Sequence, residues 1–259
     1  MGRASVVAAA STPSFVDGRV RLSLLRGFEL YAGDKSVPVP LSAQRLIAFL
    51  ALYGRPLQRL HVAGCLWLES TQEHANANLR TALWRLRRPG CAVVAATATE
   101  LSLASNVAVD VHETEDAAQR ALAHEGSQSD LERLCLAGEL LPGWYDDWLL
   151  IERERLRQLR AHALECLCDD LAAEGEFAAA TAAGLSAVSA EPLRESAHRV
   201  LIRAHLAEGN VGEAIRQYRI YRHLVRAQLG IEPSSQLREL MRGIRLPDRQ
   251  AKQLGLDAT

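Results

Sequence analysis

Residues 70–88 read STQEHANANLRTALWRLRR, and this stretch decides the fold. Ser70 and Glu73 have the S-x-x-E spacing of a capping box, in which each side chain satisfies a free backbone amide at the start of a helix. The pair Pro89-Gly90 ends the pattern, so we predict a helix over about residues 71–88. Its apolar face consists of Ala75, Leu79, Ala82, Leu83 and Leu86.

The sequence pattern before this helix predicts several strands and two further helices. Alternating apolar residues within 20–39, with a turn at Gly33-Asp34, indicate a small antiparallel sheet. Ser42 is expected to cap a first helix that ends at Gly54. A second helix is expected from about residue 57 to residue 67.

The segment after the third helix has the pattern of short strands. Residues 93–94, 101–103 and 107–111 have strand-like patterns, and residues 97–100 favour a turn between the first two of these segments. A sheet, three helices and a two-stranded hairpin in this order are typical of a winged helix-turn-helix. We therefore expect a winged-helix DNA-binding domain at residues 19–111.

Almost all of residues 112–245 have helical periodicity, and the segment contains an internal repeat. Ala173-Glu174-Gly175 recurs as Ala207-Glu208-Gly209. The same offset relates Ala163, Leu167 and Ala180 to Ala197, Leu201 and Ala214. This offset is the 34-residue period of the tetratricopeptide signature. We therefore predict a mainly α protein, in which a winged helix-turn-helix with small β-sheets precedes an all-α, tetratricopeptide-like repeat domain. Residues 1–18 are expected to be a flexible tail, and residues 246–259 a second tail.

The charge of the chain is divided unevenly between these two parts. There are 12 basic and 7 acidic residues before Val111, and 18 basic and 24 acidic residues from Val111 onward. The parts therefore carry formal charges of +5 and −6, although the whole chain carries only −1. This asymmetry indicates that the first part meets a polyanion and the second does not.

The composition excludes several classes of protein. No apolar run reaches the roughly 18 residues of a membrane span, so no membrane partner is expected. An odd number of cysteines without C-x-x-C spacing favours a reducing, cytoplasmic location, and 28 of the 30 basic residues are arginine, which suggests a bacterial genome rich in G and C. No phosphate-binding loop, nucleophile elbow or pair of catalytic carboxylates occurs, so we expect neither an enzyme nor a cofactor.

Two histidine pairings have spacings that suit a metal. His162 and Cys166 are four residues apart, and His198 and His205 are seven apart, so each pair shares one helix face. Cys166 and Cys168 point in different directions, and no third ligand is evident in the sequence. Packed core residues are the better interpretation, and we expect no metal site.

The polar face of the helix at residues 71–88 is the candidate DNA-binding site. It carries Arg80, Thr81, Trp84, Arg85, Arg87 and Arg88, and no acidic residue occurs between residues 74 and 99. A solvated helix face is the plain alternative. Arginine suits DNA because its planar fork can bind guanine O6 and N7 together or bridge phosphates. Trp84 either packs on a sugar or thymine methyl group or covers the core against the hairpin.

The same residues resemble a known family. Leu66-Trp67, residues 75–78 and residues 79–88 resemble the recognition-helix region of the OmpR-type winged helix found in the Streptomyces antibiotic regulatory protein family. Residues 140–148, followed by residues 152–156, are similar to the start of that family's bacterial transcriptional activation domain. The sequence LGIEPS that ends at Ser234 resembles its C-terminal end.

The resemblance implies a sequence-specific transcriptional activator. Such a protein binds short direct repeats in double-stranded promoter DNA, acts on the bacterial nucleoid, contacts RNA polymerase, and in this family often serves secondary-metabolite genes. A homodimer on DNA is a further implied possibility. In this chain residues 95–100 (AATATE) carry no cation, unlike the basic or glycine-rich wing tips of the family. The rival hypothesis is a tetratricopeptide adaptor whose winged helix binds protein.

Overall fold

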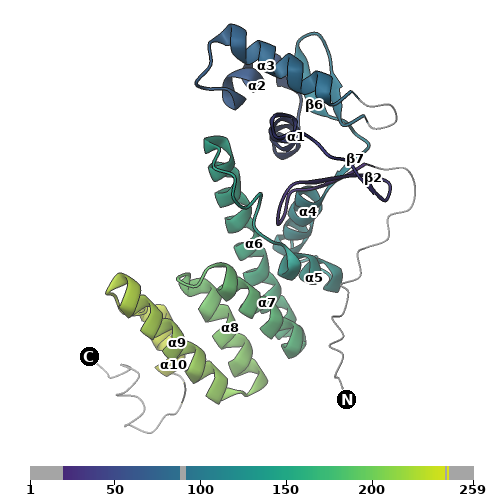
Figure 1. Ribbon diagram of the computed structural model, residues 1–259. Coiled ribbons are helices and arrows are strands. Elements are labelled where there is room, and N and C mark those ends of the chain that lie inside the picture. The colour runs from purple at the N-terminus through teal and green to yellow at the C-terminus, as the bar shows by residue number, and fades with distance from the viewer. Residues whose placement is uncertain (1–19, 88–91, 243, 245–259) are drawn as a thin grey trace, which may run out of the picture. The chain divides into compact units, whose positions relative to one another are not determined.

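The computed structural model describes residues 20–87, 92–242 and 244. The chain divides into two compact units, Met1–Asp110 and Val111–Thr259, which we call the N-terminal unit and the helical unit (Figure 1). The tails expected at residues 1–18 and 246–259 lie outside the described residues. No helix in the described ranges is both long enough and apolar enough to cross a membrane.

The first sheet of the N-terminal unit has four strands in the order β3-β2-β1-β7. Strands β1 (Val20–Ser23), β2 (Glu29–Ala32) and β3 (Lys35–Ser36) form the antiparallel meander that the sequence predicts. The strand expected at residues 107–111 is β7 (Val107–Val109), which pairs in parallel with β1 rather than with the hairpin. The Asp110 carboxylate holds this pairing by accepting hydrogen bonds from the backbone amides of Leu24 and Leu25 at 2.9–3.0 Å.

The N-terminal unit contains three helices that pack against one another: α1 (Leu41–Tyr53), α2 (Arg59–Leu66) and α3 (Gln72–Arg85). The prediction that Ser42 caps α1 was wrong. Pro40, with φ of −63°, stands at the N-cap without a capping side chain. Proline suits this site because its ring fixes φ near the helical value and the amide it lacks would be unpaired there. Eight apolar residues of α1, Ala43 and those from Leu46 to Leu52, are buried. Helix α1 therefore lies at the centre of the hydrophobic core of this unit.

The capping box predicted at Ser70 and Glu73 is not formed. The amide of Ser70 donates to the Trp67 carbonyl at 3.0 Å and so belongs to the turn after α2. Thr71 is the N-cap instead, and its hydroxyl accepts a hydrogen bond from the His74 amide at 3.4 Å. Helix α3 also ends earlier than predicted, at Arg85, because the Arg87 amide turns back to the Trp84 carbonyl at 3.1 Å in a tighter final turn.

The wing is a three-stranded sheet in the order β4-β6-β5. Strands β5 (Val94–Ala96) and β6 (Glu100–Leu103) form the expected hairpin. The third strand, β4 (Leu57–Gln58), was predicted to be the start of a helix. It pairs antiparallel with β6, placing Leu57 opposite Leu101. Both side chains are buried, so this long-range contact outweighs the local helical pattern.

The helical unit consists of seven helices within its described residues. They are α4 (Asp110–Leu122), α5 (Gln128–Leu136), α6 (Asp147–Glu174), α7 (Phe177–Ala190), α8 (Glu195–Glu208), α9 (Val211–Leu229) and α10 (Ser235–Arg242). The ends of α6 and α8 keep the period of the sequence repeat, and so do the starts of α7 and α9. Gly175 and Gly209 occupy the turns with φ of 84° and 87°, a left-handed conformation that glycine adopts without a Cβ penalty.

Small buried residues let the repeat helices approach closely. Ala180 and its repeat equivalent Ala214 are both fully buried. A Cβ atom added to Gly184 of α7 would lie 3.0 Å from the Leu201 side chain of α8. These contacts confirm the predicted fold class, a mainly α chain with small N-terminal sheets followed by a helical domain.

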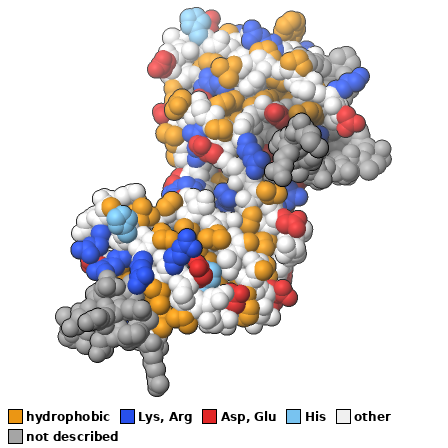
Figure 2. Space-filling model, turned by 60° about the horizontal axis from the view of Figure 1, so that its bottom comes forward, with side chains coloured by type: hydrophobic (Ala, Val, Ile, Leu, Met, Phe, Trp, Pro, Cys, Tyr) orange, Lys and Arg blue, Asp and Glu red, His pale blue; other side chains and the backbone are white. Residues whose placement is uncertain are grey.

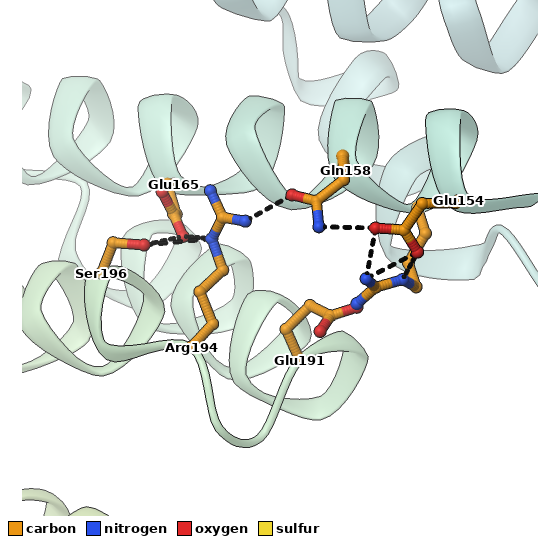
Figure 3. A network of polar contacts seen from close by, with 7 residues as sticks. Glu154, Gln158, Glu165, Glu191, Arg194 and Ser196 are labelled. Carbon is orange, nitrogen blue, oxygen red and sulfur yellow. Dashed lines mark hydrogen bonds and ion pairs between the residues drawn. The ribbon is translucent and has the colours of Figure 1, made fainter. Parts of the chain in front are cut away.

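A polar network ties the turn between α7 and α8 to α6 (Figure 3). Arg194 donates through Nε to Glu165 at 2.6 Å and through Nη1 to Gln158 at 2.7 Å. The Ser196 hydroxyl donates to the same Glu165 carboxylate at 2.7 Å. Because Arg194 and Glu165 each bond to at least two partners here, the network fixes the turn more firmly than one exposed ion pair would.

A buried carboxylate makes the stability of the helical unit depend on pH. Asp130 accepts hydrogen bonds from the Arg120 guanidinium and from Ser127 at the start of α5. Bonding to Arg120 and Ser127 lowers the pKa of Asp130 from 3.8 to about 2. Because the pKa of Asp130 is lower in the folded chain than in the unfolded chain, the group stabilises the fold at pH values above its unfolded-state pKa. This contribution is lost as the pH falls through the folded-state pKa.

We therefore expect the helical unit to lose about 2 kcal/mol of unfolding free energy from this group between about pH 4 and pH 2. Urea unfolding of the full chain across that range measures the loss. The Asp130→Asn variant is expected to be less stable at neutral pH and to depend less on pH in this window. An identical pH dependence in the variant and the parent chain would contradict the assignment.

Candidate nucleic-acid interface

Helix α3 presents one buried face and one exposed face, as its sequence pattern predicts. Ala75, Leu79 and Ala82 are buried. Because residues on opposite sides of a helix cannot both face the core, the side chains between them point to solvent. The exposed candidate residues are Arg80, Thr81, Trp84 and Arg85 on α3 and Arg87 just after it. Arg88, the sixth candidate, lies outside the described residues.

Local contacts orient some of these exposed side chains. Arg85 donates through Nη1 to the hydroxyl of Ser42 at 3.2 Å, which ties the end of α3 to the start of α1. The Thr81 hydroxyl donates to the Ala77 carbonyl one turn earlier at 3.0 Å, so it keeps only acceptor capacity for a ligand. Trp84 is 70% exposed, which does not fit the alternative that it covers the core.

A groove lies between α3 and the wing sheet. It encloses about 1060 Å³, and its described lining includes Arg59, Arg80, Arg87 and the exposed Trp84. No acidic residue is among the described residues that line it. A concave surface that combines several guanidinium groups with an aromatic ring is suited to a polyanion, because the cations remain available to external phosphates or base edges.

Arg59 is a candidate that the sequence analysis missed. Its backbone amide donates to the Thr99 carbonyl at 2.9 Å, and its guanidinium donates to the Thr97 carbonyl at 3.2 Å. The wing tip itself has no cation, as expected, but the first residue of α2 places one beside it. The pairing of β4 with β6 produces this arrangement, and a pairing between segments so far apart in the chain leaves no local sequence signal.

The arginines of the groove differ in their pairing from several arginines of the helical unit. Among the residues that the structure describes, none forms an ion pair with Arg59, Arg80 or Arg87. In the helical unit, by contrast, Arg155 pairs with Glu115 and Glu152, and Arg203 pairs with Asp169. Figure 2 shows acidic and basic side chains intermixed on the face in view. The guanidinium groups of the groove are therefore not neutralised by described carboxylates.

The structure gives different surroundings to the histidine and cysteine residues that the sequence offered as possible metal ligands. His198 is buried, donates from Nε2 to the Pro192 carbonyl at 2.9 Å and accepts at Nδ1 from Gln217 at 2.8 Å, so it is a satisfied core residue. His162 is exposed on α6 and lies outside any group of metal-ligand type found in the described residues. Cys166 instead lies close to His124 and Asp170.

Comparison with known proteins decides the family. The model of the bacterial transcriptional activator domain matches residues 109–245, which is more than half of the chain. The chain belongs to this family. The match covers the segment in which the sequence resembles the activation domain of the Streptomyces antibiotic regulatory protein family, and it confirms that resemblance.

Two curated relatives have the same name, regulatory protein AfsR. The protein of Streptomyces coelicolor is 28% identical over 240 residues, which are 88% of this chain and 24% of the relative. The protein of Streptomyces griseus is 27% identical over 257 residues, covering 93% of this chain and 26% of the relative. The chain thus spans about a quarter of the length of these relatives.

A solved structure has the same fold. Mycobacterium tuberculosis EmbR, in complex with a low-affinity phosphopeptide, superposes with a TM-score of 0.63 over 92% of this chain and 70% of EmbR. The sequence identity is 20%. The superposed residues include both units of this chain. EmbR therefore also has a winged helix followed by a helical domain.

Proposed function

We propose that the chain is a sequence-specific DNA-binding activator of transcription. The observation that carries this proposal is the groove between α3 and the wing, with Arg59, Arg80 and Arg87 and no acidic residue in the described lining. DNA binding is assigned to residues 19–111 and activation to residues 112–245. The role is regulatory rather than enzymatic.

The arrangement suggests how DNA is read. Helix α3 enters the major groove with the face that carries Arg80, Thr81, Trp84 and Arg85, because an α-helix fits that groove. The arginine forks bind guanine edges or phosphates, and the free face of Trp84 packs on a sugar or a thymine methyl group. Arg59 and the wing then contact the adjacent backbone, where the negative potential of the DNA is high.

The helical unit is assigned a protein partner. Its net charge of −6 opposes contact with DNA, and stacked repeat helices present an extended surface for binding proteins. We propose that this unit recruits RNA polymerase at promoters, that the protein binds direct repeats there as a homodimer, and that it acts on the nucleoid in the cytoplasm. Secondary-metabolite genes are the proposed targets.

Selection of duplexes from a random library, followed by transcription with purified polymerase, tests the proposal. The full chain is expected to enrich a short repeated sequence and to raise transcription from a promoter that carries it. A chain that ends at Asp110 is expected to bind the same sequence weakly and not to activate. If no duplex is enriched and the chain captures only protein, the adaptor hypothesis is correct instead.

Replacing Arg59 tests the contribution of the wing. We expect Arg59→Ala to weaken binding to all duplexes similarly and to reduce the slope of log affinity against log salt by about 0.9, which is the value for one lost phosphate contact. Fluorescence anisotropy at several salt concentrations measures both. Arg219→Ala, which removes an exposed arginine of α9, is the matched control and is expected to change neither. Equal slopes for Arg59→Ala and the parent chain would remove Arg59 from the interface.

A further inference from the structure

Three side chains of metal-ligand type meet on the helical unit, outside the groove. His124 follows α4, and Cys166 and Asp170 lie one turn apart on α6. The Cys166 Sγ atom is 3.6 Å from His124 Nδ1 and 4.0 Å from Asp170 Oδ2, and His124 Nδ1 is 3.0 Å from the same Asp170 Oδ2. The ligand atoms therefore surround one point.

These separations match those of a tetrahedral zinc site. With Zn–S of about 2.3 Å and Zn–N and Zn–O of about 2.1 Å, sulfur and nitrogen lie about 3.6 Å apart, and nitrogen and oxygen about 3.4 Å apart. The observed sulfur-to-nitrogen separation needs no change. The two separations that involve Asp170 need shifts of about 0.5 Å or less, which a rotation of its carboxylate supplies.

The backbone holds the three residues in place. Cys166 and Asp170 are four residues apart, so they share one face of α6, while Leu167 and Cys168 between them are buried. His124 has φ of 60°, and its amide donates to the Ala121 carbonyl at 3.1 Å at the end of α4. Gly126 follows so closely against α6 that an added Cβ would meet the Leu167 side chain at 2.5 Å.

We propose that His124, Cys166 and Asp170 bind a divalent cation of the zinc class, with water as the fourth ligand. His124 is largely exposed, which leaves the fourth position open to solvent. Nitrogen, sulfur and carboxylate oxygen together are a donor set that zinc accepts, whereas magnesium and calcium prefer oxygen alone. Binding releases the thiol proton to solvent and links the segment after α4 to α6.

The inference revises the expectation of no metal site. The sequence pairs Cys166 with His162, one turn before it on α6, but His162 does not belong to the cluster. The other two ligands come from the end of α4 and from the next turn of α6. Because the new site lies entirely within the helical unit, it does not depend on the proposed DNA binding.

Metal titration of the reduced, chelator-treated full chain tests the site. We expect one equivalent of Zn²⁺ to bind, and Co²⁺ to produce a thiolate-to-cobalt charge-transfer band. Loss of an outer-sphere partner already lowers metal affinity about 10–100-fold, so Cys166→Ser and His124→Ala should each lower it at least tenfold. Cys65→Ser is the matched control, since Cys65 also lies near a histidine, with Sγ 3.7 Å from His61 Nε2, but without a third ligand among the described residues.

Thermal unfolding separates ligand loss from misfolding. In chelator, the Cys166→Ser and His124→Ala variants are expected to unfold at the same temperature as the parent chain, because both side chains are at least partly exposed. Zinc is expected to raise the unfolding temperature of the parent chain and of Cys65→Ser only. Zinc affinity that is equal in the parent chain and both ligand variants, or a cobalt complex without a charge-transfer band, would overturn the proposal.

Discussion

A chain with Arg80, Arg85 and Arg87 all replaced by alanine is expected to bind its selected duplex at least about 100-fold more weakly than the parent chain. Each arginine that reads a base contributes about 1–3 kcal/mol, so the three together exceed this threshold even at the lower limit. The three side chains are exposed and lack carboxylate partners among the described residues, so their removal should leave the fold intact. Fluorescence anisotropy at one fixed salt concentration measures the loss.

Replacing the same three residues by lysine is the matched control. Lysine keeps the positive charge but lacks the planar fork that binds guanine O6 and N7 together. We therefore expect the lysine variant to retain most of its affinity for unrelated duplexes and to lose its preference for the selected sequence. If the alanine variant bound the selected duplex as tightly as the parent chain, α3 would not be the recognition helix.

Leu201→Ala is expected to destabilise the helical unit by about 2–5 kcal/mol, because the side chain is fully buried and the helices cannot close the cavity. Leu201 lies directly against Gly184, at the closest approach of α7 and α8. Hydrogen exchange followed by mass spectrometry measures the effect separately in each unit. Faster exchange is expected throughout α6–α9 and unchanged exchange in α1–α3, since the two units have separate cores.

The functional effect of Leu201→Ala should also be confined to the helical unit. DNA binding is expected to persist, while activation of transcription falls with the stability of the helical unit. Leu185→Ala is the control, because Leu185 lies beside Gly184 on α7 but is half exposed. A similar loss of stability in both variants would show that the interface between α7 and α8 is not the critical contact.

The sequence predicted those parts of the fold that depend on local periodicity. The exposed face of α3 follows from residues close together in the chain, and the helix repeat follows from a pattern that recurs at a fixed period. The cap of α3 was misplaced by one residue, because Ser70 and Thr71 both carry hydroxyls and only the turn after α2 decides between them. A turn between residues three apart therefore overrides the capping preference of Ser70.

Other missed features depend on contacts between distant parts of the chain. Strand β7 pairs in parallel with β1 although all three helices of the N-terminal unit lie between them in the sequence, and β4 joins the wing through only Leu57 and Gln58. Arg59 enters the groove as a consequence of that second pairing. His124 reaches Cys166 from the end of a different helix, so no spacing rule could have connected them.

The central claim is that the arginines of α3 read guanine in the major groove, and methylation of guanine N7 tests it most directly. The selected duplex is methylated with dimethyl sulfate, and the fraction that the full chain still binds is separated and cleaved at the modified bases. We expect N7 methylation at specific guanines of each repeat to exclude the duplex from the bound fraction. Arg80→Ala or Arg85→Ala is expected to abolish that exclusion at one position each. Full binding of duplexes methylated at every guanine of the site would contradict the claim.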